Sequence, residues 1–131
     1  MDDIIMGVDE SEARAEAQIE SIEDLPLNRD DVRVTILHAL SENPEGASAS
    51  QIGPVRHAAE TLEADGFTVE MKAIDGKPST VLTETAEELD ACLISVAGRK
   101  RSPSGKVLFG STAQSVILET DIPTMVSGAP K

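Results

Sequence analysis

The sequence predicts an α/β fold, namely an open five-stranded parallel sheet with four helices covering both faces. Short apolar segments, which are typical of buried strands, alternate along the chain with segments whose apolar residues recur every three or four positions. Such alternation favours parallel strands joined by right-handed crossovers. The 131 residues show no linker or internal repeat, so we expect residues 1–131 to form a single domain.

The first half of the chain predicts two strands and two helices. Residues 2–9 form an apolar run with little alternation, as expected of a strand covered on both faces. Residues 11–25 carry apolar positions at helical spacing, and residues 31–40 have the β-branched enrichment of a strand. Residues 50–65 again show helical spacing, and Gly66 follows where a C-terminal helix cap belongs.

The second half predicts three strands and two helices. Residues 67–74 alternate between polar and apolar, which indicates a half-buried strand near an edge. Residues 76–91 predict a helix, and the continuously apolar residues 91–97 predict a buried strand. A fourth helix is expected from Ser111, and residues 123–128 form a final apolar strand whose edge would be exposed in a monomer.

The composition is strongly acidic. Twenty-four Asp and Glu residues against eleven Lys and Arg residues give a formal net charge of −13, which disfavours nucleic acid and anionic membranes as partners. Such a surface would suit a halophilic cytoplasm, where salt screens the self-repulsion. The absence of Trp and Tyr also argues against a base-stacking surface. With one cysteine, no apolar run of membrane-spanning length and no signal-peptide pattern, we expect a cytoplasmic protein.

Two segments follow strands at the edge where parallel sheets bind ligands. In the first, "GVDES", Gly7 permits close backbone approach and Asp9 could accept hydrogen bonds from a ribose hydroxyl or an adenine amino group. A simpler interpretation is that Asp9 or Ser11 caps the following helix. In the second, Ser111 with Gln114 matches a capping box, and the same helix start could bind phosphate through its free N–H groups and dipole.

The second segment is also basic. Four cations precede its helix: Arg99, Lys100, Arg101 and Lys106. They could strengthen a phosphate site, or they could form a solvated loop that balances the acidic surface. The segment is no P-loop, because six residues rather than four separate Gly98 from Gly105, and Val107 stands where magnesium needs a hydroxyl.

No catalytic constellation is evident. Cys92 falls in a predicted buried strand without an adjacent base, which favours packing over nucleophilic catalysis. His38 ends a strand and could face the cleft, but neither it nor His57 has further ligands spaced for a metal. We therefore predict that the protein is not an enzyme, although slow ATP hydrolysis is compatible with a site that positions phosphate and metal.

Four stretches, "IIMGVDES", "VTILHAL", "DGKPSTVLTETAEELDACLISVAG" and "GKVLFGSTAQSVILETDIPTMVS", together resemble the universal stress protein family over essentially the whole chain. The resemblance implies an adenine nucleotide alpha hydrolase-like, Rossmann-like sheet and a role in stress survival. It also implies a cytoplasmic homodimer paired through the C-terminal strand, residues 123–127, whose further protein partners the sequence does not name.

Many members of this family bind ATP through Gly-x2-Gly-x9-Gly-Ser/Thr after the fourth strand. By resemblance the ligand is ATP or AMP, with Mg²⁺ or Mn²⁺ accompanying ATP. The candidate nucleotide-binding residues are Val8 and Asp9 at adenine or ribose, Ile36 at the base, and Ala97, Gly98, Lys100, Gly110, Ser111 and Thr112 around phosphate. Ala97 and Lys100 replace the first two glycines, and the added Cβ of Lys100 restricts the backbone. The sequence thus allows a nucleotide-responsive stress module or a nucleotide-independent dimer with a degenerate phosphate loop.

Overall fold

The computed structural model describes residues 1–39, 52–100 and 109–129. Within them every predicted strand and helix is present, and the predicted α/β fold is confirmed. The elements are β1 (Asp2–Gly7), α1 (Glu12–Glu23), the 3₁₀ helix η1 (Arg29–Asp31), β2 (Val32–Ala39), α2 (Gly53–Ala64), β3 (Thr68–Ile74), α3 (Pro78–Glu88), β4 (Leu93–Lys100), α4 (Ser111–Glu119) and β5 (Thr124–Ala129). None of the helices in this described part is long and apolar enough to cross a membrane.

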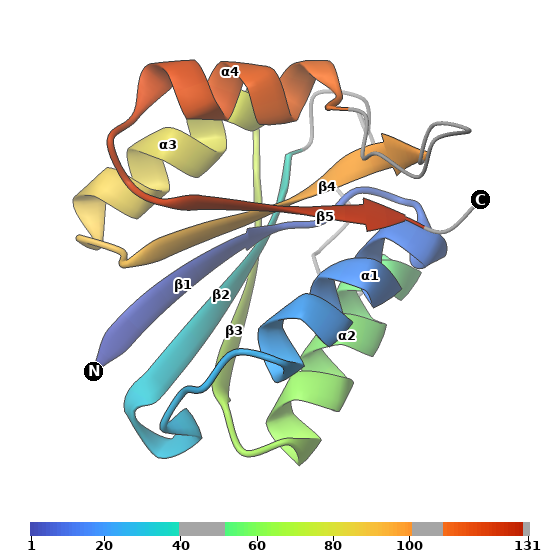
Figure 1. Cartoon of the computed structure of the whole chain (residues 1–131), viewed down its shortest axis with the longest axis vertical. Helices are drawn as coiled ribbons and strands as arrows, with labels where there is room; N and C mark the ends of the chain where they lie inside the picture. The colour runs from blue at the N-terminus through green and yellow to red at the C-terminus, as the bar shows by residue number, and fades with distance from the viewer. Residues whose placement is uncertain (40–51, 101–108, 130–131) are drawn as a thin grey trace.

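The five strands are parallel, in the order β3-β2-β1-β4-β5. Figure 1 shows α1 and α2 on one face of the sheet and α3 and α4 on the other. The chain builds outward from β1 through β2 to β3, then crosses to the other side of β1 to form β4 and β5. The loops after β1 and β4 therefore diverge toward opposite faces, and this divergence leaves a crevice at the C-terminal edge.

The core lies on both faces of the central strand. Ile4 and Met6 pack with the residues of α1 and α2, while Ile5 between them packs with the residues of α3 and α4. All three side chains are 0% exposed, which explains why this segment is continuously apolar rather than alternating. β3 is an edge strand with mostly exposed or half-buried residues, as its alternation predicted.

The helix ends match the predictions in one case and differ in another. Gly66 follows α2 with φ of +104°, the left-handed conformation expected of a residue just past a helix. The predicted capping box is wrong, because Gly110 rather than Ser111 is the N-cap of α4 and no side chain caps it. Instead, the Gln114 side chain donates to the carbonyl of Phe109 at 3.3 Å. The helix starts one residue earlier than a Ser111 cap requires, and so the Ser111 hydroxyl has no capping role.

Candidate functional site

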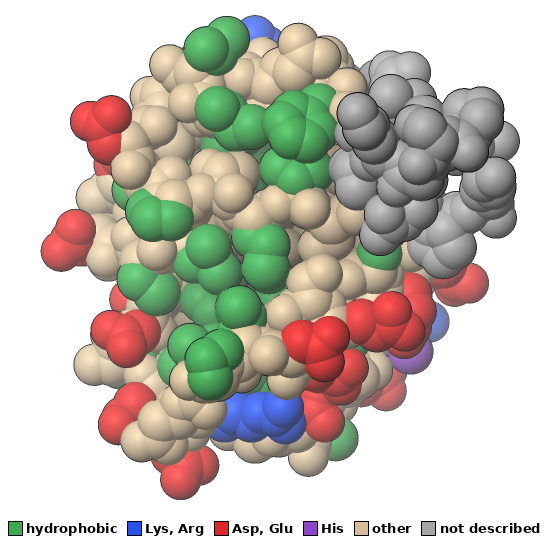
Figure 2. Space-filling view, viewed as in Figure 1, with side chains coloured by type: hydrophobic (Ala, Val, Ile, Leu, Met, Phe, Trp, Pro, Cys, Tyr) green, Lys and Arg blue, Asp and Glu red, His purple; other side chains and the backbone are tan. Residues whose placement is uncertain are grey.

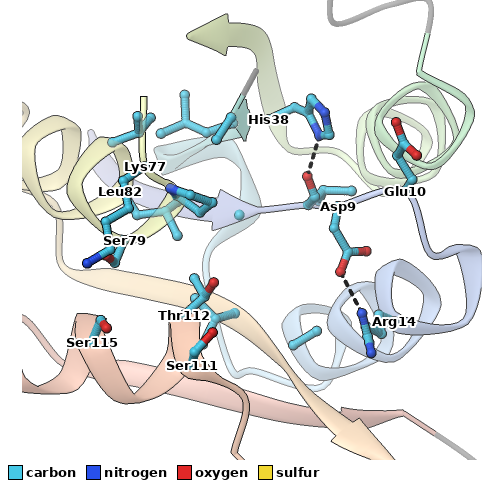
Figure 3. A pocket seen from close by; sticks show the side chains of 18 of the residues that line it. Asp9, Glu10, Arg14, His38, Lys77, Ser79, Leu82, Ser111, Thr112 and Ser115 are labelled. Atoms are coloured by element: carbon cyan, nitrogen blue, oxygen red, sulfur yellow. Dashed lines mark hydrogen bonds and ion pairs between the residues drawn. The ribbon is translucent and has the colours of Figure 1, made fainter. Parts of the chain in front are cut away.

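A cavity of about 680 Å³ lies at the C-terminal edge of the sheet, within the usual size range of small-molecule sites. The ends of β1, β2 and β4 and the starts of α1, α3 and α4 contribute its walls (Figure 3). It occupies the crevice where the strand order reverses, between β1 and β4. The fold therefore places the cavity where open α/β sheets bind ligands.

Asp9, just past β1, is held by the start of α1. One carboxylate oxygen accepts a hydrogen bond from the backbone N–H of Ser11 at 2.8 Å, and the other pairs with the Arg14 guanidinium at 2.9 Å. Ser11 is the N-cap of α1, where its hydroxyl accepts from the backbone N–H of Arg14. The capping interpretation thus holds for Ser11. The Asp9 side chain remains 49% exposed, and a carboxylate has lone pairs for further donors, so it can still bind a ligand.

β2 contributes a buried histidine to the cavity. His38 is 7% exposed, and its Nδ1 lies 2.9 Å from the carbonyl of Val8. Because that carbonyl can only accept, Nδ1 carries the proton of this hydrogen bond. Val8 in turn donates its backbone N–H to the carbonyl of Leu37, so this wall is rigid. His38 thus lines the cleft, which is one of the two placements that its sequence position allowed.

Three hydroxyl side chains line the cavity from the first turns of α4: Ser111, Thr112 and Ser115. They lie together on the α4 side of the cavity in Figure 3. The first N–H groups of a helix lack intrahelical acceptors, and its dipole makes this end positive. This wall therefore combines hydroxyl and amide donors suited to an anion. Ser115 belongs to no motif and could have been found only from its spacing one helical turn after Ser111.

α3 forms a wall that the sequence motifs missed. Lys77, Ser79 and Leu82 line the cavity from its first turns. The available signal was positional, since Lys77 follows a predicted strand and so falls at the same sheet edge as the recognised motifs. A Cβ added to Gly7 would lie 2.7 Å from a Leu82 methyl carbon, so the close approach that Gly7 permits is made by α3.

A buried glutamine lies beneath the cavity. Gln18 on α1 is 1% exposed, and its amide nitrogen donates to the carbonyl of Gly7 at 2.9 Å. It also lies 3.3 Å from the carbonyl and 3.2 Å from the hydroxyl of Ser95. One side chain thereby bridges β1 and β4 at the point where the pairing of these two strands ends.

The structure brings five of the predicted residues to the cavity wall: Val8, Asp9, Ala97, Ser111 and Thr112. Gly98 and Gly110 are not among the described residues that line it. Ile36 is fully buried with the core residues of α1 and α2, whereas Leu37 lines the cavity. The described cavity lining thus includes the residue after Ile36 rather than Ile36 itself, because successive strand residues point to opposite faces.

The backbone is a strand at Ala97 and Lys100, the positions of the first two glycines of the family motif. β4 runs to Lys100, where Ala97 pairs with Ser127 and Lys100 with Ala129 across an irregular register. Backbone groups that pair with β5 are less free to wrap a phosphate than those of a glycine loop. The structure does not describe the side chains of residues 99 and 100. Arg101, Gly105 and Lys106, which the sequence offered for phosphate binding, also lie outside the described residues.

The described cavity lining carries two acids, Asp9 and Glu10, and two bases, Arg14 and Lys77. No group of three or more His, Cys, Asp or Glu side chains in this described part could hold a metal ion.

Cys92 is an exposed residue immediately before β4, contrary to its predicted place within a buried strand. Partial burial, together with the nearby charge of Asp2, raises the pKa of its thiol. The thiol form is therefore favoured over the nucleophilic thiolate.

Fold and cavity define an open parallel α/β domain with its ligand crevice between β1 and β4. The model of the universal stress protein family matches residues 1–127, and the chain belongs to this family. Among proteins with curated functions, none matches the chain.

Several solved structures share the fold. A universal stress protein from Archaeoglobus fulgidus has a TM-score of 0.76 at 26% identity, covering 97% of this chain and 98% of that one. A universal stress protein from the same organism in complex with dAMP has a TM-score of 0.73 at 21% identity, with coverage of 97% and 98%. An Arabidopsis thaliana family member with AMP bound has a TM-score of 0.66 at 14% identity, with coverage of 98% and 92%. At 21% and 14% identity, the last two comparisons establish similarity of fold alone.

Proposed function

We propose that the protein is a stress-response module that binds an adenine nucleotide, ATP or AMP, in the cavity. The observation that carries this proposal is the meeting of a carboxylate after β1 with the hydroxyl-rich start of α4 across one crevice. The dAMP and AMP complexes of proteins with this fold support it. No acid–base pair or nucleophile is assigned in the described cavity wall, so we propose binding rather than catalysis.

The cavity residues suggest one orientation of the nucleotide. The Asp9 carboxylate accepts hydrogen bonds from the ribose hydroxyls, beside the wall of Val8 and His38. The phosphate lies at the start of α4, where Ser111 and Thr112 and the helix N–H groups donate to its oxygens. The ligand then acts by changing the stability of one conformation relative to another, which requires different affinities for the two.

Calorimetric titration with AMP and with ATP, the latter with and without Mg²⁺ and Mn²⁺, tests the proposal. Asp9→Asn and Ser111→Ala should each weaken binding, about tenfold for a lost hydrogen bond to a charged group. Asp121→Asn and Thr68→Ala are matched controls, because both residues are exposed and lie outside the cavity. Absence of heat from every titration, with no nucleotide released on denaturing the purified protein, would leave the nucleotide-independent dimer as the function.

We further propose a cytoplasmic homodimer paired through residues 123–127. β5 is an edge strand, and Figure 2 shows hydrophobic side chains gathered across the face that carries β5 and α4. Leu118 is 85% exposed and Ile117 is 42% exposed on α4. An unpaired strand beside exposed apolar side chains favours pairing with a second copy.

A further inference from the structure

The start of α3 has unused hydrogen-bond donors. α3 runs for 11 residues from Pro78, and its N-cap Lys77 has an extended backbone whose side chain makes no capping hydrogen bond. The N–H groups of Ser79 and Thr80 precede the first intrahelical bond, which Val81 donates to the carbonyl of Lys77. This end of the helix is therefore positive and uncapped.

Ser79 adds a buried hydroxyl at the same place. The residue is 1% exposed and lines the cavity, and its Oγ has no hydrogen-bond partner among the described residues. The hydroxyl of Thr83, one turn later, is satisfied by the carbonyl of Ser79 at 3.0 Å. Buried hydroxyls in folded proteins nearly always have a partner. Of the two described buried hydroxyls without a partner, those of Thr35 and Ser79, only that of Ser79 belongs to the cavity lining, so a partner from outside the chain can reach it.

The cation beside this hydroxyl is also unpaired. Lys77 lines the cavity, and no described residue forms a salt bridge with it. Arg14, the other cavity base, is already paired with Asp9. Figure 3 shows Lys77 and Ser79 on one side of the cavity and Asp9 and Arg14 on the opposite side. The positive charge at α3 is thus not neutralised by the cavity's own acids.

The geometry points to a second anion subsite at the start of α3, separate from the start of α4. Its ligand is a tetrahedral oxyanion of the phosphoryl type. The Ser79 hydroxyl and the N–H groups of Ser79 and Thr80 donate to the oxyanion's oxygens, and Lys77 supplies the charge. The oxyanion is either inorganic phosphate or a phosphoryl group of a larger ligand in the cavity.

Titration of ¹⁵N-labelled protein with inorganic phosphate tests this subsite. The amide signals of Ser79 and Thr80 should shift and saturate. Lys77→Gln and Ser79→Ala should each raise the dissociation constant about fivefold, as expected for the loss of one partly screened contact to an anion. Lys72→Gln removes the same charge from an exposed position on β3 outside the cavity and should change nothing. Unsaturable shifts, shifts confined to Ser111 and Thr112, or equal effects of both lysine variants would overturn the proposal.

A parallel titration with AMP identifies the source of the oxyanion. If AMP shifts Ser79 and prevents phosphate from binding there, the nucleotide's phosphoryl group fills the subsite. If AMP shifts only the amide signals of Ser111 and Thr112 while phosphate still shifts that of Ser79, free phosphate is the ligand of the subsite. Saturable phosphate binding at Ser79 without any response to AMP, or to ATP titrated in the same way, would keep the subsite and reject the proposed nucleotide function. The reverse pattern, AMP binding with no anion at Ser79 in either titration, would reject the subsite alone.

Discussion

Gly7 lines the cavity, and its lack of a side chain is also needed for the packing of α3 against β1. It ends the central strand, and a built Cβ would lie 2.7 and 2.8 Å from the two Leu82 methyl carbons of α3. Leu82 is itself 4% exposed and belongs to the core on that face. The contact thus couples the end of β1 to the helix that carries Lys77 and Ser79.

Gly7→Ala should destabilise the protein by about 1–3 kcal/mol, because Leu82 must leave its packed position to admit the methyl group. The free energy of unfolding in urea measures the effect. Gly53→Ala is the control, since a Cβ there meets only a Glu12 oxygen at 3.9 Å and should change stability by less than about 0.5 kcal/mol. Equal losses in both variants would contradict the packing argument.

Single residues were predictable from sequence when their role depends on chain position. Asp9 and Ser111 follow strands, so topology alone brings them to one edge. Gln18 and Ser79 escaped notice because their roles depend on what the tertiary fold places around them. The described cavity lining includes the residue after Ile36 rather than Ile36 itself, because one step along a strand exchanges the faces of the sheet.

At the scale of elements, the C-terminal ends of α1 and α2 are joined by one arginine. Arg29 of η1 donates to the carbonyls of Asp65 and Glu23, each at 3.1 Å, and lies over the Phe67 ring. A cation suits the negative ends of two helices. The same junction also contains two carboxyl groups. The side-chain hydrogen bond with Asp65, burial and the Asp65 charge raise the pKa of Glu23 to about 7, while the charge of Arg29 opposes the rise.

This junction should make stability fall as pH rises. The raised pKa means that the folded state holds the Glu23 proton more tightly than the unfolded state, where the ordinary value is 4.5. The stabilisation is therefore complete below about pH 4.5 and is lost as pH rises through about 7. Glu23→Gln should remove this loss, and its urea midpoint should exceed that of the wild type at pH 8.

Glu63→Gln is the matched control for that measurement, because Glu63 is exposed on α2. The informative quantity is the difference between each variant and the wild type at every pH, because this difference isolates the effect of the substituted side chain. A Glu23→Gln curve parallel to the wild-type curve from pH 5 to 8 would exclude the raised pKa.

Elements were predicted well where the pattern is local. The 3.6-residue period and the apolar runs identified the four α-helices and five strands of the described residues but not the 3₁₀ helix η1, and Gly66 marked the end of α2. α4 begins at Ser111 as predicted, but its N-cap is Gly110 rather than Ser111, because a Gly110-Ser111 pair offers two caps that sequence cannot rank. The extension of β4 to Lys100 depends on pairing with β5, a contact between distant segments.

At the scale of the whole molecule, the proposed dimer brings together two chains that each carry a net charge of −13. Salt should therefore strengthen association by screening the repulsion. In this register the backbone N–H and C=O of Met125 point toward β4. Those of the next residue, Val126, therefore point to the open edge of the sheet. That donor is available to a partner strand.

Val126→Pro removes this outward donor while leaving the bonds to β4 in place, which an edge strand tolerates. Light scattering should give twice the 13.8 kDa chain mass for the wild type in molar KCl and a monomer for the variant. Val126→Thr is the control, because it keeps the donor and the branched shape, and it should remain dimeric. A monomeric wild type, or a dimeric proline variant with an unchanged circular dichroism spectrum, would contradict pairing through β5.

Gln18 has a consequence for how the crevice responds to its contents. Its amide lies between the carbonyls of Gly7 on β1 and Ser95 on β4. The two strands therefore cannot move apart without breaking hydrogen bonds in the buried interior. The backbone at this point is thus already ordered before a ligand binds, so binding costs little conformational entropy there. Motion that carries a signal would then arise at the rim, in the first turns of the helices, and pass to the molecular surface from above the sheet rather than through it.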